Sequence, residues 1–265
     1  MPPLRLLESM NPARLATYRE ECARITGMSA SGVPKETVAA LYVWQTALSA
    51  AWFENLAYTE AILRHSIDDA LRVWNKNRCG TEDWLREPDK KLASFVKKSA
   101  QDAKRQAESA KQRRAPEHSR KYAPVVFDDL IAQLSFGNLA FLLPINPPTN
   151  RADLGSGYKK REHLWRSGLS DAFPNLTMGT VQRWAGIQSS DIPTDVIAGY
   201  AVGSAVDRLV RLRNRVGHHE QILNVNHTRL RKDMTLLLRS VNPGASEAIK
   251  RIDRVPRILA MKPVP

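Results

Sequence analysis

A long run of helical periodicity, from about Lys35 to Trp74, constrains the fold more than any other feature of the sequence. Apolar residues recur there every three or four positions, as in a helix with a buried face. The middle of the run, Ala47 to Leu63, is apolar nearly all round and is expected to be the central buried helix, either unbroken or broken once. No convincing period-two run and no Asn-Gly or Asp-Gly hairpin signal competes with this pattern. The sequence therefore predicts an all-α fold.

Further helices are expected on both sides of this run. A first helix follows Asn11, which is a suitable N-cap, and ends at about Thr26, where Gly27 closes it. Residues 29–34 and 75–88 have the composition of loops. Later helices are expected over residues 125–143, 159–173, 178–188, 195–219 and 226–240. The remaining tail, from residue 255, contains prolines and is expected to be irregular.

Size and composition indicate one large domain. With 265 residues, of which 43% are hydrophobic, the chain can bury a sizeable core. No segment approaches the roughly 20 apolar residues of a membrane-spanning helix, and the first ten residues lack the apolar stretch of a secretory signal. Cys22 and Cys79 stand alone, so neither a disulfide framework nor a zinc site is expected. These features favour a reducing, cytoplasmic setting.

The charge balance points to a polyanionic partner. Forty basic residues against 27 acidic ones give a net charge of +13 and a pI near 10. Such an excess favours nucleic acid above all. An anionic membrane surface, or solubility alone, would also account for the excess.

Much of this charge lies in residues 89–122, where eleven Lys or Arg and four Asp or Glu contribute +7. A narrow stripe at helical spacing runs through the segment, formed by Leu92, Val96, Ala100, Ala103, Ala107 and Ala110. The pattern predicts a basic helix that is either merely solvated or an RNA-gripping arm. In the second interpretation the RNA-binding residues are Lys97, Lys98, Lys104, Arg105, Lys111, Arg113 and Arg114.

The helix expected at 195–219 carries two different faces. Its core stripe consists of Ala205, Leu209, Leu212 and Val216. A polar face opposite to it consists of Tyr200, Asp207, Arg211, Asn214 and His218, and from Asp207 onward the neighbours are three or four residues apart. Arg213 lies near the edge of the core stripe and can join the polar face through its long side chain. His219 is expected on the core side, in a structural role.

The end of this helix has the residue types that RNA cleavage by internal transesterification requires. The 2′-hydroxyl attacks phosphorus, which needs a base, an acid and positive charge near the phosphate oxygens. His218 can act as base or acid, Arg213 can bind the phosphate, and Asn214 can orient either group. The same residues could instead simply stabilise the C-terminal end of a helix dipole. No metal and no cofactor are expected.

Four segments resemble one known family. Arg213-Asn-Arg-Val-Gly-His218 resembles the Arg-x(4–6)-His motif of HEPN ribonucleases, and His218-His-Glu-Gln221 resembles the His-His-Glu-Pro that follows it in Abi-like (abortive-infection) proteins. Residues 42–67 resemble that family's N-terminal helix, although His65 stands where Asn is usual. Leu134-Ser-Phe-Gly-Asn138 and Asp171-Ala-Phe-Pro174 also look like family segments, so the resemblance covers about residues 40–235.

This resemblance implies a four-helix HEPN-like core, at about 36–75 and 124–240, within a single domain 1–265 that carries additional helices and a basic helical insertion at about 89–122. It also implies a metal-independent endoribonuclease of a bacterial phage-defence or toxin system, acting as a homodimer with both motifs facing one cleft. Glu60 and Arg64 would support the site from a neighbouring helix, or form an ordinary ion pair. Asp207 and Arg211 would support it from the same polar face.

Two alternatives belong to other functional classes. The chain could be a non-catalytic RNA-binding protein held by a structured non-coding RNA, for which the basic 89–122 segment is suited. It could also be a toxin that is regulated by nucleotidylation, with Tyr200 or Tyr42 as acceptor. The segment Leu134 to Gly137 is expected to pack a helix against the core, with Gly137 allowing a close approach.

Overall fold

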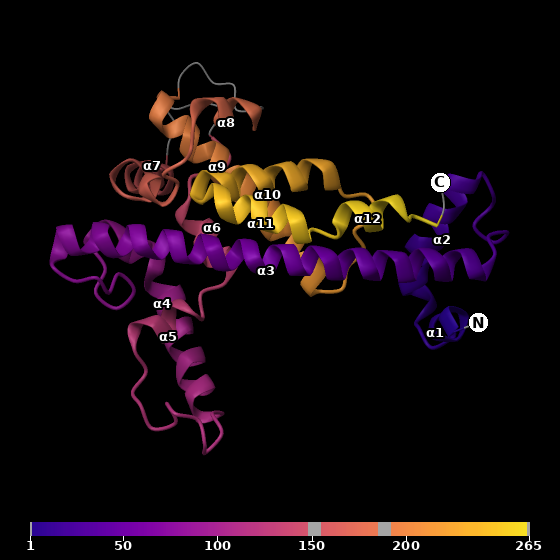
Figure 1. Cartoon of the computed structure of the whole chain (residues 1–265), viewed down its shortest axis with the longest axis horizontal. Coiled ribbons are helices and arrows are strands. Elements are labelled where there is room, and N and C mark those ends of the chain that lie inside the picture. Colours follow the sequence, from indigo (N-terminus) through magenta and orange to yellow (C-terminus); the bar gives the residue numbers. More distant parts are fainter. Residues whose placement is uncertain (1, 148–154, 185–191, 264–265) are drawn as a thin grey trace. The chain divides into compact units, whose positions relative to one another are not determined.

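A computed structural model of the chain describes residues 2–147, 155–184 and 192–263, and every regular element in these ranges is a helix (Figure 1). The predicted all-α fold is therefore confirmed. Contacts divide the chain into two compact units. Unit 1 comprises residues 1–57, 212–225 and 249–265, and unit 2 comprises residues 58–211 and 226–248. None of the described helices is both long and apolar enough to cross a membrane.

Unit 1 is built from both ends of the chain. It contains α1 (Pro2–Glu8), α2 (Pro12–Thr26), the first part of α3 (Lys35–Cys79), the end of α9 (Thr194–Gly217), the end of α11 (Pro243–Ile252) and α12 (Val255–Ala260). Helix α2 has the predicted caps: the Asn11 side chain accepts a hydrogen bond from the Ala13 N–H, and Gly27 has φ +70°.

Long-range hydrogen bonds tie α3 to the C-terminal segment within unit 1. Trp44 Nε1 donates to the Ile258 carbonyl at 2.6 Å, and Asn55 Nδ2 donates to Asp253 Oδ1 at 2.7 Å. The prediction of an irregular tail from residue 255 is wrong, because α12 begins there. Val255, at the start of α12, is fully buried, so this short helix is anchored by burial that periodicity over six residues does not reveal.

Unit 2 contains the remaining helices. They are the rest of α3, α4 (Lys90–Gln112), α5 (Phe127–Ile131), α6 (Phe136–Leu142), α7 (Ser156–Ser167), the 3-10 helix η2 (Leu169–Ala172), α8 (Met178–Arg183), most of α9, α10 (His227–Val241) and the start of α11. The helix predicted over 125–143 is two short helices, because the Ser135 side chain caps a new helix and accepts from the Asn138 N–H at 3.2 Å. The last residues of the helix predicted over 178–188 lie outside the described ranges.

Helix α3 departs from its prediction in two ways. It is unbroken, which was one of the two predicted alternatives, but its 45 residues continue to Cys79 instead of ending near Trp74. It is also not buried all round, because Phe53 is 58% exposed, whereas Trp52 and Leu56 on the other side are buried. The prediction from the apolar composition of residues 47–63 thus overestimated how much of the helix surface is buried.

Two glycines seat α9 within unit 2. A Cβ on Gly203 would stand 2.0 Å from the Pro144 carbonyl oxygen, and one on Gly199 would stand 2.8 Å from the Trp165 ring. Only glycine allows backbones to approach this closely. Gly137, by contrast, is exposed. A Cβ placed there would come no closer than 3.7 Å to its nearest neighbour, the Ser135 hydroxyl, so the predicted close approach is wrong. The predicted core stripe from Ala205 to Val216 is buried throughout and is confirmed.

Candidate functional site

The backbone at the end of α9 turns sharply through a left-handed residue. His219 has φ +56°, one of only two non-glycine residues with positive φ in the described ranges. Its N–H donates to the Val216 carbonyl at 3.1 Å, and the Glu220 N–H donates to the Arg215 carbonyl at 2.8 Å. This is a Schellman motif, a helix ending in which glycine usually holds the left-handed position. Helix α9 therefore ends at Gly217, earlier than predicted, and His218 begins the turn.

A side chain of helix α2 is hydrogen-bonded to the backbone of this turn. Arg14 Nη2 donates to the His219 carbonyl at 2.8 Å. A hydrogen bond with Tyr42 raises the pKa of the Arg14 guanidinium, so the group stays charged and is bound from two sides. The Tyr42 ring lies 5.0 Å from that of Tyr18, whose pKa burial raises to about 12. Sequence reasoning missed Arg14, because 205 residues separate it from His219.

The three predicted catalytic residues lie together at this end of α9, in unit 1. Arg213 is half-buried, and its Nη1 lies 3.9 Å from where a Cβ on Gly217 would stand. Its guanidinium thus extends along the helix toward the residue that precedes His218. Asn214 and His218 are exposed one helical turn apart. His219 is also exposed, so the prediction that its side chain turns to the core is wrong.

The predicted supporting residues all belong to unit 2. Arg64 Nη2 pairs with Glu60 Oε1 at 2.6 Å and donates to the Leu134 carbonyl at 2.8 Å, just before α6 begins. These contacts are those of a half-buried ion pair that holds a helix start. Arg211 Nη2 pairs with Asp207 Oδ2 at 2.9 Å on the surface of α9.

Tyr200 does not belong to the exposed polar face predicted for α9. It is completely buried, and its hydroxyl donates to Glu162 Oε1 at 2.8 Å. The buried carboxylate on α7 turns this position inward, which the sequence of α9 alone does not reveal. A buried hydroxyl is also unsuited to be the acceptor of a nucleotidyl group, and that prediction for Tyr200 is wrong.

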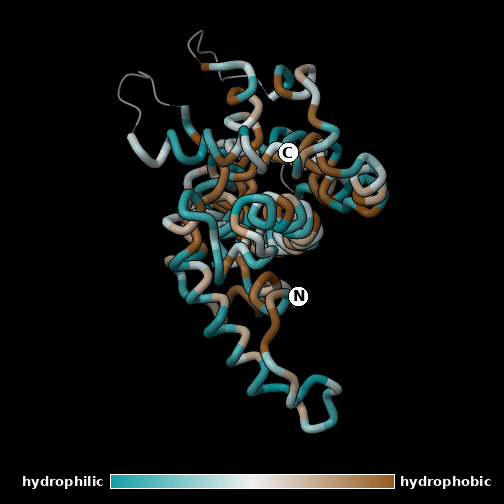
Figure 2. Tube along the Cα trace, turned by 90° about the vertical axis from the view of Figure 1, so that its left-hand side faces the viewer, coloured by the Kyte–Doolittle hydropathy of each residue, from teal (hydrophilic) through white to brown (hydrophobic). Residues whose placement is uncertain are grey.

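The basic segment forms α4 and a loop of residues 113–126 that returns to α5 (Figure 1). Asp89 caps α4 by accepting from the Lys91 N–H at 2.9 Å. The predicted stripe is confirmed, since Leu92, Val96, Ala103 and Ala107 are buried and Ala100 and Ala110 are half-buried. Figure 2 shows that the far end of this segment is largely hydrophilic.

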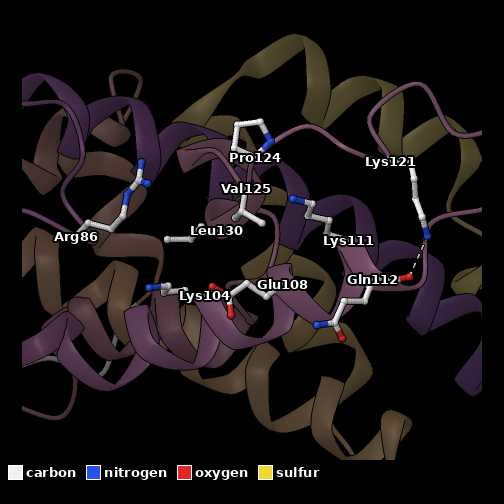
Figure 3. A pocket seen from close by; sticks show the side chains of 9 residues that line it. All are labelled: Arg86, Lys104, Glu108, Lys111, Gln112, Lys121, Pro124, Val125 and Leu130. Atoms are coloured by element: carbon white, nitrogen blue, oxygen red, sulfur yellow. Dashed lines mark hydrogen bonds between the residues drawn. The ribbon is translucent and has the colours of Figure 1, made fainter.

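Residues of α4, of the loop and of the segments next to them line an open hollow of about 540 Å³ (Figure 3). Its lining consists of Arg86, Lys104, Glu108, Lys111, Gln112, Lys121, Pro124, Val125 and Leu130. A second hollow of about 480 Å³ shares Arg86, Lys104 and Leu130 with it and continues to Lys97. We call this continuous depression the α4 groove. All of its residues belong to unit 2.

The predicted RNA-binding residues therefore separate into two sets. Lys97, Lys104 and Lys111 line the α4 groove. Lys98, Arg105 and Arg113 are exposed but do not line it, and Arg105 pairs with Asp102 at 2.9 Å. Arg114 does not line the groove either, because its guanidinium pairs with Asp129. Arg86 and Lys121 were not predicted, because nothing in the sequence indicates that their segments face α4.

Asp129 on α5 fixes the loop. Its carboxylate accepts from Arg120 at 2.7 Å and from the Val126 N–H at 2.9 Å, and pairs with Arg114 at 3.3 Å. Although burial opposes it, these hydrogen bonds and charges hold the pKa of Asp129 below its usual value. The charge of Arg114 is thus paired within the framework of the loop.

Among the described residues, no three His, Cys, Asp or Glu side chains cluster closely enough to hold a metal ion. No protein-family model matches the chain, no curated protein matches it, and no solved structure matches it. The site must therefore be interpreted from its own geometry.

Proposed function

We propose that the protein is a metal-independent endoribonuclease whose active centre is the end of α9. The observation that carries this proposal is the presence, within six residues at one helix end, of a guanidinium, an amide and an imidazole next to a turn to which a second helix is hydrogen-bonded. Arg213 would bind the phosphate oxygens, His218 would transfer the proton, and Asn214 would orient one of them. A preorganised centre needs such support from outside its own helix.

The proposed reaction is a transesterification within the RNA strand. The 2′-oxygen forms a bond to phosphorus while the bond from phosphorus to the 5′-oxygen breaks. The 2′-hydroxyl proton passes to a base and the 5′-oxygen receives a proton from an acid, leaving a 2′,3′-cyclic phosphate and a 5′-hydroxyl. One His218 cannot easily serve as base and acid in the same step. We therefore propose a homodimer in which the His218 of each of two copies takes one role.

The experiment compares wild type, Arg213→Ala and His218→Ala in two settings. Each protein is induced in a bacterial host while total RNA is mapped for new 5′-hydroxyl ends, and each purified protein is incubated with RNA in EDTA. New ends and growth arrest with wild type alone, together with cleavage that persists in EDTA, support the proposal. Folded wild-type protein that leaves RNA intact under varied conditions contradicts it. The family resemblance supports a bacterial, cytoplasmic phage-defence or toxin setting.

A second candidate function is RNA binding without catalysis, in which the protein is held by a structured non-coding RNA. The basic lining of the α4 groove favours it. In that case RNA co-purifies with the protein, the complex dissociates as salt rises, and His218→Ala leaves the complex unchanged.

A further inference from the structure

We infer that the α4 groove binds the phosphate backbone of single-stranded nucleic acid. The groove belongs to unit 2 and includes no residue of the proposed active centre. The binding chemistry is independent of the proposed cleavage. That RNA instead of DNA is the natural ligand rests on the proposed function.

The positive charge of the groove has a regular spacing. Lys97, Lys104 and Lys111 follow one another at seven-residue intervals and all line the groove. Seven residues are about two helical turns, so the ammonium groups form a row with steps of about 10 Å along one face. Within the part of the chain that the structure describes, no carboxylate pairs with any of the three. A row of free charges matches a linear polyanion better than a compact one.

The loop of residues 113–126 forms the wall of the groove that faces α4, and hydrogen bonds and ion pairs hold this loop in place. Lys121 Nζ donates to the Gln112 carbonyl at 3.2 Å, which closes the end of the cavity (Figure 3). The ion pairs of Asp129 with Arg114 and Arg120 fix the rest of the loop. Those two arginines are neutralised in part by Asp129, and Arg86 in the lining is paired with Asp83, so the unpaired charge of the groove comes from lysines. Glu108 is the one acidic side chain in the lining.

Apolar residues occur among the cations of the lining, although Leu85 and Leu130 are buried, and an exposed aromatic residue follows one of the cations in the sequence. The groove includes Leu85, Pro88, Val125 and Leu130 between the cations. Tyr122 is 88% exposed and follows Lys121 directly. Exposed aromatic rings are the groups on which unpaired bases stack, and the inference assigns that role to Tyr122. A duplex hides its bases and would leave these groups unused, which favours a single strand.

An acidic peptide is the competing ligand. It would use the lysines but gain nothing from a stacking ring, so the contribution of Tyr122 separates the two. Single-stranded RNA and single-stranded DNA share the phosphates and bases and differ in the 2′-hydroxyl, so they form two arms of the same test.

The test measures binding of labelled oligouridine, oligothymidine, an RNA duplex and a polyglutamate peptide by fluorescence anisotropy over a range of salt concentrations. All proteins carry His218→Ala, which keeps the RNA intact if the proposed function is right and changes nothing in the groove. The groove variant is Lys104→Gln with Lys111→Gln. Its matched control is Lys98→Gln with Arg105→Gln, on the same helix and with the same loss of charge. Circular dichroism checks that each protein is folded.

We expect the groove variant to bind oligouridine about 25-fold more weakly at about 0.1 M salt, with a salt slope smaller by about 1.4, because each lost phosphate contact removes about 0.7 from the slope. The control should stay close to the parent protein. Tyr122→Ala should weaken binding about tenfold, and Tyr122→Phe should restore it, because stacking needs the ring and not the hydroxyl.

Equal losses in the groove variant and its control would overturn the inference in favour of diffuse electrostatics. Preference for duplex or for polyglutamate, or the absence of oligouridine binding at low salt, would overturn it as well. A tighter complex with oligouridine than with oligothymidine identifies RNA as the source of the phosphates. These outcomes are separate from cleavage. A protein that binds through the groove but never cuts RNA contradicts only the proposed function, and cleavage with unaltered binding by the groove variant contradicts only this inference.

Discussion

The end of α9 and the α4 groove both carry cationic side chains, but the groups that accompany those cations differ. The end of α9 carries Arg213, Asn214 and His218 just before a left-handed turn, and Arg14 of another helix is hydrogen-bonded to that turn. The α4 groove has a row of lysines with apolar residues between them, and its lining contains no histidine. Proton transfer needs a few groups with fixed geometry, whereas backbone binding needs many charges with loose geometry. Under the two proposals, chemistry and affinity would therefore reside in separate regions.

The largest expected effect tests that separation directly. His218→Ala should lower the maximal rate of RNA cleavage by about 10²–10⁴-fold, the usual contribution of general acid–base catalysis, with little change in KM. Lys104→Gln with Lys111→Gln should raise KM and leave the maximal rate nearly unchanged. Single-turnover cleavage at rising enzyme concentration measures both. If both variants alter the same kinetic parameter, the two regions act as one site, which would contradict their separate roles.

The next effect concerns the framework of the groove. Asp129→Asn should lower the free energy of unfolding by about 2 kcal/mol, because charge-assisted hydrogen bonds to two arginines are lost. Asp128→Asn is the matched control: Asp128 is exposed and pairs with Arg72 on the surface, so its loss should cost less than about 1 kcal/mol. Urea denaturation measures both. Equal effects would show that Asp129 does not hold the loop.

Acid should act on the same framework. The pKa of Asp129 is lower in the folded protein than in the unfolded chain, so its contribution to stability is complete above the unfolded pKa of about 3.9. It is lost as the pH falls through the lower, folded value. We therefore expect the stability difference between wild type and Asp129→Asn to disappear below that range, as measured by urea denaturation at a series of pH values. A difference that persists in acid would mean that the charge of Asp129 is not the cause.

A smaller effect is expected at the turn after α9. His219→Gly should stabilise the protein by about 1 kcal/mol, because glycine adopts the left-handed conformation without steric cost. RNA cleavage should persist, since the proposal uses only the backbone of this residue. Thermal unfolding and the EDTA-containing cleavage assay check the two statements. Loss of cleavage with unaltered folding would assign the His219 side chain a role in the chemistry.

The smallest effect separates packing from function at Gly217. Gly217→Ala should stabilise α9 by about 0.5 kcal/mol through helix propensity. The added methyl would meet Arg213 Nη1 only at 3.9 Å, an ordinary contact, so the cleavage rate should not change. A reduced rate in the cleavage assay would show that the guanidinium needs the space over Gly217 during the reaction.

Periodicity was sufficient to predict the long helices α2, α3, α4, α9 and α10 and the core stripe of α9, because these depend on residues within a few turns of one another. It failed where distant partners decide. Tyr200 is turned inward by Glu162 on another helix, and α12 is held by the burial of one valine. The groove could be predicted only in part, since the spacing of Lys97, Lys104 and Lys111 is visible in the sequence whereas the opposing loop is not.

The candidate catalytic residues were identified from their order along α9, but their support was not. Arg14 has no local signal, and its bond to the His219 carbonyl closes a loop of 205 residues. The direction of Arg213 also required the structure, because its helical angle falls at the edge of the core stripe.

The way unit 1 is assembled has a consequence for the order of events during synthesis. The α4 groove lies between residues 86 and 130 and is complete in sequence when only half of the chain has been translated. The end of α9 must wait for His219 to meet Arg14, and the first part of α3 must wait for Asp253 and Ile258. Contacts this distant form only after the intervening chain has left the ribosome. If both proposals are right, the segment that binds RNA is therefore synthesised before the residues that cut it can be brought together.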